Sequence, residues 1–217
     1  MSLRSTTALR DLILSSLDAR FAMIGHQRRA GRQVWHRAID AERSHGVHLH
    51  FGLYENEGRV TVIPSIGVRY ASIEDALLAA AVVRGANARD RVTFSKPLGE
   101  LSGAEYQTDL ECGAEGIATR IWTDVETYGL PFLRSISDLE EVIALLASPE
   151  PRDWCCPGPG LRARLLVLAL DGAGRRSDAL ELLDGLWADL LDRDAVVPPF
   201  ERFAAWFRLG GSCEPIG

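Results

Sequence analysis

The chain has 217 residues, of which 47% are hydrophobic and 25% are charged, and its formal net charge is −6 at pH 7. These values are typical of a globular protein with a sizeable core, and the acidic balance argues against a basic nucleic-acid-binding protein. The sequence contains no apolar run of about 18 residues and no secretory signal peptide, so it predicts no membrane-spanning segment.

The first predicted element is an amphipathic helix that ends at Gly25. Its apolar residues recur at helical spacing, at positions Leu9, Leu12, Ile13, Leu17 and Phe21. A basic segment follows, and residues 1–39 together carry seven arginines against two aspartates, a net charge of +5. Such an uneven charge distribution can steer a partner of opposite charge.

Three stretches after this segment predict an antiparallel meander. They span residues 34–39, 47–53 and 59–63, and alternation resumes over 66–70, beyond Pro64. Between residues 47 and 53 every odd position is apolar, which indicates a strand with one buried face. The sequence Glu-Asn-Glu-Gly at 55–58 predicts the intervening turn, because Asn and Gly tolerate positive φ.

A helix is predicted to begin at Ser72, whose side chain can accept a hydrogen bond from a free backbone N–H group. It should end near Gly85, and residues 92–94 then form a short strand. The next stretch, residues 96–116, is rich in glycine, proline and carboxylates, and we interpret it as a long acidic loop.

Residues 117–128 fit either a strand or a helix, and the pattern does not choose between them. The sequence Ser-Asp-Leu-Glu at 137–140 predicts a capping box. It opens a helix whose apolar stripe contains Leu139, Val142, Ile143 and Leu146.

We therefore predict an α+β fold, with an antiparallel sheet of three to five strands and helices packed on one face. This domain spans residues 1–148, a Pro/Gly linker covers 149–160, and a helical subdomain covers 161–217. The subdomain consists of a hairpin of two helices, which resembles a tetratricopeptide unit, and a terminal helix after Pro198. A single hairpin of this kind has to pack on another surface.

His36, His48 and His50 are the candidate metal ligands. The spacing of His48 and His50 places both rings on one face of a strand, and His36 on a neighbouring strand could complete a three-imidazole zinc site. A hydrolase or metal-dependent enzyme using this face is the alternative to a binding protein. Solvated histidines on a half-exposed sheet explain the same residues, so we predict no cofactor and no catalytic residue.

Other catalytic signals are weak. The sequence lacks the motifs of serine hydrolases, P-loop proteins, dinucleotide-binding folds and zinc proteases. Cys112, Cys155, Cys156 and Cys213 predict reduced thiols in a cytoplasmic protein, with a bridge such as Cys112 to Cys156 as the alternative. Cys155 or Cys156 could act as a nucleophile, but their position between proline-rich turns favours a structural role.

The candidate partner-binding residues are Arg28, Arg29, Arg32 and Arg37. They could contact phosphates, but Trp35 is the only aromatic residue nearby, which disfavours nucleic acid as the ligand. An acidic protein partner fits the cluster better. The carboxylates of the predicted loop 96–116 and of residues 177–194 would offer a second surface of opposite charge.

One series of motifs resembles uncharacterised bacterial families of immunity-like proteins. It combines the first helix, the strand Gln33-Val34-Trp35-His36-Arg37, the meander with His48-Leu49-His50-Phe51, and the turn Leu130-Pro131-Phe132. The resemblance covers residues 7–147 and implies a bacterial protein that binds another protein without catalysing a reaction. It supplies no catalytic residues, and the sequence specifies neither the partner nor the oligomeric state.

Overall fold

The computed structural model describes residues 5–29, 32–80, 92–148, 158–192 and 198–212. The chain divides into two compact units, each assembled from separate stretches of sequence. Unit 1 contains residues 1–39, 44–68 and 95–135, and unit 2 contains residues 40–43, 69–94 and 136–217. The predicted linker lies mostly outside the described residues, and the helix that follows it already begins at Gly158.

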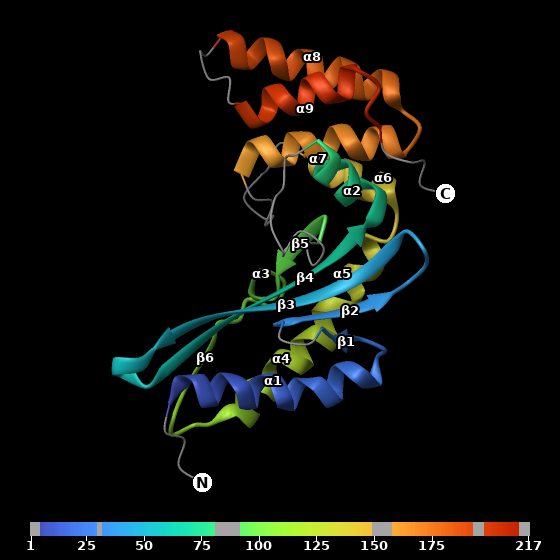
Figure 1. Cartoon of the computed structure of the whole chain (residues 1–217). Coiled ribbons are helices and arrows are strands. Elements are labelled where there is room, and N and C mark those ends of the chain that lie inside the picture. The colour runs from blue at the N-terminus through green and yellow to red at the C-terminus, as the bar shows by residue number, and fades with distance from the viewer. Residues whose placement is uncertain (1–4, 30–31, 81–91, 149–157, 193–197, 213–217) are drawn as a thin grey trace. The chain divides into compact units, whose positions relative to one another are not determined.

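An antiparallel sheet confirms the predicted α+β fold (Figure 1). Its order is β1-β2-β3-β4-β5, and β6 also pairs with β4. The six described strands exceed the upper limit of the predicted three to five by one, because three short strands join the three strands of the meander. The strands are β1 Gln27–Arg28, β2 Val34–Ala38, β3 Arg43–Tyr54, β4 Arg59–Tyr70, β5 Phe94–Pro97 and β6 Tyr106–Asp109.

The alternating burial predicted for residues 47–53 is confirmed at the centre of β3 but not at its end, where Leu53 is 36% exposed. Val47 and Leu49 are buried on β3, while His48 is half-buried and His50 is exposed. The turn η1, Glu55–Glu57, ends at Gly58, whose positive φ of 60° matches the expected role of glycine there. Pro64 does not interrupt β4, which continues to Tyr70.

Two helices of unit 1 contact each other and the buried side of the sheet (Figure 1). They are α1, Thr6–Met23, and α4, Ala114–Asp124. Trp35 is fully buried there, with its ring 4.9 Å from that of Phe21, and its indole N–H donates to the Asp18 carboxylate at 2.8 Å. Leu12 was predicted on the apolar face of α1 but is 46% exposed, so the buried stripe is narrower than the sequence suggested.

The predicted acidic loop over residues 96–116 is wrong. This stretch contains the end of β5, the short helix α3 (Leu98–Ser102), all of β6 and the start of α4. Gly103 and Gly113 have φ near +71° and +76°, and they make the tight reversals between these elements. The glycines that suggested a loop are therefore turn residues between short regular elements.

Residues 117–128 are helical, which resolves the open choice. Helix α4 passes into a π-helical turn, η3, over Val125–Gly129, and then into α5, Leu130–Ser135. Pro131 lacks the N–H group that an uninterrupted α-helix would use at this point. A Cβ atom on Gly129 would lie 2.7 Å from Cδ1 of Ile66, so the absence of a side chain lets this turn pack closely on β4.

Unit 2 is mainly helical, as predicted for the C-terminal part of the chain. Helices α7 and α8 form the hairpin, with Gly174 at φ +75° in its turn. Asp138 caps α6 by accepting from the Glu140 N–H group, so the predicted cap at Ser137 is one residue too early. The helices are α2 Ala71–Ala79, α6 Leu139–Ala147, α7 Gly158–Gly172, α8 Arg176–Asp192 and α9 Pro198–Arg208. None of the helices in the described ranges has the length and apolarity that crossing a bilayer requires.

Candidate functional site

The predicted arginine cluster surrounds β1, the edge strand of the sheet. Arg28 lies opposite Trp35 in the β1–β2 register, and Arg37 lies opposite His45 in the β2–β3 register. Alternation along the strands therefore places Arg28 and Arg37 on the side of the sheet that faces α1. The Arg28 guanidinium is 2.9 Å from the Asp18 carboxylate and 5.9 Å from the centre of the Trp35 ring.

Arg29 and Arg32 occupy the tight connection between β1 and β2. The Arg29 N–H donates to the Val34 carbonyl at 3.2 Å, and the Arg32 N–H donates to the Arg29 carbonyl at 3.0 Å. Arg29 is exposed and Arg32 is half-exposed. The four arginines thus surround one sheet edge, which we call the basic edge, instead of lying on one flat face.

Two of the three candidate metal ligands come together. His36 pairs with Gly46, and His48 lies two residues further along β3 on the same face. Because Gly46 has no side chain, the two rings meet edge to face with their centroids 5.9 Å apart. His50 makes no ring contact with either of them, and within the described part of the chain no three His, Cys, Asp or Glu side chains could hold a metal ion.

His26 was not predicted as a site residue, yet it is a buried histidine with a strongly lowered pKa. It lies between Gly25 and β1 and is only 1% exposed, and neither ring nitrogen has a hydrogen-bond partner. Burial lowers its pKa to about 4, and the neighbouring His45, Arg37 and His36 lower it further, while the Ile24 backbone acts in the opposite direction. A single histidine after a glycine carries no periodicity, so only the tertiary packing reveals it.

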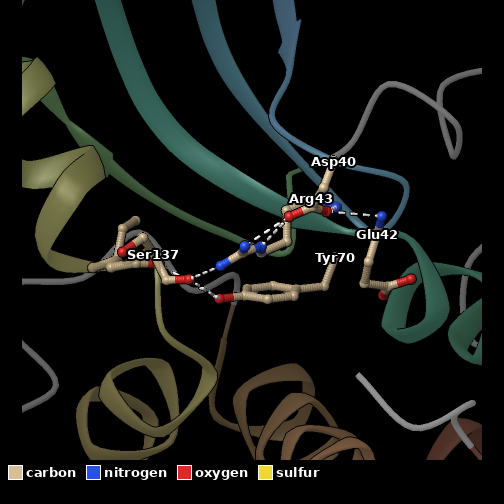
Figure 2. Close-up of polar contacts among 6 residues, drawn as sticks. Asp40, Glu42, Arg43, Tyr70 and Ser137 are labelled. Atoms are coloured by element: carbon tan, nitrogen blue, oxygen red, sulfur yellow. Dashed lines mark hydrogen bonds and ion pairs between the residues drawn. The ribbon is translucent and has the colours of Figure 1, made fainter. Parts of the chain in front are cut away.

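A polar network in unit 2 joins the β2–β3 turn to the start of α6 (Figure 2). The Arg43 guanidinium donates to the Asp40 carboxylate at 2.7 Å and to the Ser137 carbonyl, and the Tyr70 hydroxyl lies 3.5 Å from the same carbonyl. The Arg43 hydrogen bond holds the pKa of Asp40 below its usual value, and burial raises the pKa of Tyr70 to about 12. These partners occupy the polar atoms, so the network is a structural anchor.

Glu42, in the same turn, caps helix α2. Its backbone carbonyl accepts from the Ala71 N–H at 2.8 Å, and its carboxylate accepts from both the N–H and the hydroxyl of Ser72. The predicted role of Ser72 as the cap is therefore reversed, since Ser72 donates to a carboxylate from a distant segment. A carboxylate at this helix end also interacts favourably with the helix dipole.

Two adjoining grooves follow the β4–β6 ladder in unit 1. The apolar groove has a volume of about 300 Å³ and lies beside Ile63, Pro64, Pro97, Ala104 and Tyr106. The polar groove has a volume of about 250 Å³ and is lined by Glu57, Arg59, Gln107, Thr108, Asp109 and Cys112. Gln107 lines both grooves, so they adjoin at this residue of β6.

Cys112 is an exposed free thiol in the polar groove. A hydrogen bond to the Asp109 carboxylate and the charge of that group raise the pKa of the thiol, which keeps it in its less reactive form. The other three cysteines of the sequence lie outside the described residues.

Replacing Asp109 by Asn should therefore speed the alkylation of Cys112 by iodoacetamide at pH 8, because the amide removes the charge that disfavours the thiolate. Mass spectrometry of the peptide that contains Cys112 measures the rate. Glu126→Gln, an exposed neutralisation elsewhere in unit 1, is the matched control. Equal rates in the parent and in Asp109→Asn would show that Asp109 does not control the thiol.

No known protein family matches this chain, and comparisons with curated proteins and with solved structures also find no match. A functional conclusion therefore depends on the basic edge and on the grooves along β6.

Proposed function

We propose that this chain works by binding another protein, as an immunity-like module, and that the basic edge contacts an acidic surface of that partner. The single observation that carries this proposal is the concentration of exposed arginines around a sheet edge. Arg28 on β1, Arg37 on β2 and Arg29 in the connection between these strands are all exposed, whereas the whole chain is acidic.

The edge strand gives this surface a second means of contact. Among the strands that the structure describes, β1 pairs with β2 alone, so its other side can offer backbone groups to an incoming segment. Arginine is well suited to such a role, because its planar guanidinium binds carboxylates through two parallel hydrogen bonds. Opposite charges across the interface would raise the association rate and select the partner.

A charge-reversed variant tests the proposal. The wild-type chain is used to isolate a partner from a lysate of its source organism, and the purified partner is then titrated against Arg29→Glu/Arg32→Glu. We expect its Kd to rise about 10- to 100-fold, because two favourable charge pairs become repulsive. The affinity of the wild type should also fall as the salt concentration rises.

Arg134→Glu/Arg202→Glu changes the net charge by the same amount at exposed positions elsewhere and serves as the control. It should bind the partner within about twofold of wild type, since neither arginine belongs to the basic edge. Equal affinities of the two double variants would contradict the role of the basic edge. A partner whose contact surface is basic would contradict it as well.

A further inference from the structure

The apolar groove exists because the β4–β6 ladder ends early. Val62 pairs with Tyr106, and this is the last pair of the ladder at that end. Pro64, two residues further along β4, has no N–H group with which to continue it. The chain between β5 and β6 bends away there through α3, and the side chains of Pro97 and Ala104 form the far wall.

An exposed aliphatic side chain marks the opening of this groove. Ile63 is 51% exposed although the neighbouring β4 residues Val62 and Ile66 are buried. The ring of Tyr106 is held in place, because its hydroxyl donates to the Asp124 carboxylate at 2.8 Å and lies 3.1 Å from the Ser102 hydroxyl. Tyr106 itself is only 3% exposed, so Ile63, with the half-buried Pro97 and Ala104, supplies the accessible apolar surface of the groove.

The adjoining polar groove is rich in carboxylates. Glu57 and Asp109 line it, and Glu105, exposed, lines the neighbouring apolar groove. Backbone N–H groups of Cys112 and Glu111 hydrogen-bond to Asp109, which lowers the pKa of its carboxyl and keeps it ionised. Arg59 is engaged by Glu57 at 2.9 Å and lies over the Tyr54 ring at 4.5 Å, so the two adjoining grooves together have an excess of negative charge.

We propose that this groove binds an extended segment of a partner protein, with an apolar side chain beside Ile63 and Pro64 and an adjacent arginine or lysine beside Asp109 and Glu57. β6 has four residues, and an extended peptide rises about 3.3 Å per residue, so a segment of four to five residues spans both grooves. The site goes beyond the proposed function. It is built on β4 and β6, whereas the basic edge is built on β1 and β2, and the two surfaces have opposite charge.

Three capped pentapeptides serve as probes in an NMR titration of the ¹⁵N-labelled chain. Their sequences are Gly-Leu-Arg-Arg-Gly, its acidic twin Gly-Leu-Glu-Glu-Gly, and Gly-Gly-Arg-Arg-Gly, which lacks the apolar side chain. The first should shift the amide resonances of Ile63, Ala104, Gln107 and Asp109 and saturate in the millimolar range or below. The other two should bind at least about fivefold more weakly.

Two variants complete the experiment. Glu57→Gln/Glu105→Gln should lower the affinity for the first peptide at least about threefold. Glu126→Gln, which neutralises an exposed carboxylate of η3, should leave this affinity unchanged. Equal affinities for all three peptides, or shifts confined to residues outside the grooves, would overturn the proposal. Sedimentation that detects self-association, abolished by Glu57→Gln/Glu105→Gln, would also overturn it, because a second copy would then be the occupant. None of these results depends on the basic edge, so failure here is separate from failure of the proposed function.

Discussion

Unit 1 should lose about 3 kcal/mol of unfolding free energy as the pH falls from 7 to below 4, through protonation of His26 alone. The pKa of His26 is about 4 in the folded chain, whereas a solvated histidine has a pKa of about 6.5. Between these two values the unfolded chain binds more protons than the folded one, so stability falls as the pH falls. The contribution is intact above about pH 6.5 and is lost once the pH passes below about 4.

The structure explains why protonating His26 in the folded chain costs so much free energy. His26 is buried with Phe21 nearby, and the charged or titratable groups that act on it are His45, Arg37 and His36, all of which oppose a positive charge. A protonated ring would therefore carry two N–H groups without carboxylate acceptors in a cationic environment. Local opening of the α1–β1 connection would relieve this cost.

Urea unfolding followed by tryptophan fluorescence, repeated from pH 7.5 to pH 4, measures the effect, since Trp35 and Trp122 report on unit 1. In His26→Leu, the loss of unfolding free energy between pH 7.5 and pH 4 should be smaller by most of the expected 3 kcal/mol, because leucine cannot be protonated. His50→Leu removes an exposed ring and should keep the parent profile. Parallel profiles for the parent and for His26→Leu would contradict the assignment.

Replacing Arg176 by Ala should destabilise unit 2 by about 3 kcal/mol, because a buried carboxylate loses its ion pair. The Arg176 guanidinium is 2.9 Å from Asp171, whose side chain is only 4% exposed. It also donates to the Phe207 carbonyl at 2.8 Å and lies 4.4 Å from the centre of the Phe207 ring. One side chain thus ties the α7–α8 hairpin to α9.

Thermal unfolding followed by circular dichroism tests this expectation, and a second variant separates the charge effect from lost packing. Asp171→Asn/Arg176→Met should recover about half of the lost stability, since removing both charges avoids a buried carboxylate that has lost its Arg176 ion pair. Arg208→Ala, which breaks the exposed pair of Arg208 with Asp184, should cost no more than about 1 kcal/mol. A loss at Arg176→Ala as small as that at Arg208→Ala would refute the role of this ion pair.

The sequence was informative where one physical period dominates a stretch. Alternation located the strand at 47–53, where Val47 and Leu49 are buried, and helical spacing located α9, which buries one face of phenylalanines. Helical spacing also located the hairpin, although residues 167–172 of α7 are all buried. The sequence pattern failed at 96–116, where glycines mark reversals between elements of four or five residues that are too short to show a period. It also left 117–128 open, since a helix that changes type at Val125 mixes two spacings.

The candidate site was predictable in composition but not in geometry. The arginines and histidines were identifiable as residues, yet their faces depend on strand register, which pairs His36 with Gly46 and Arg37 with His45. His26 and the grooves beside β6 arise from contacts between segments far apart in the chain. The carboxylate of Glu42 at the start of α2 is another such case, because no local pattern links residue 42 to residue 72.

The interleaved order of the two units has a consequence for biosynthesis. The polypeptide passes from one unit to the other at five boundaries, the last of them at residues 135 and 136. A growing chain therefore cannot finish unit 1 before most of the first two thirds has left the ribosome, and unit 2 has to wait for the terminal helix. Folding of both bodies depends on late, non-local closure, which is intrinsically slow, so premature termination should leave exposed strands that favour aggregation.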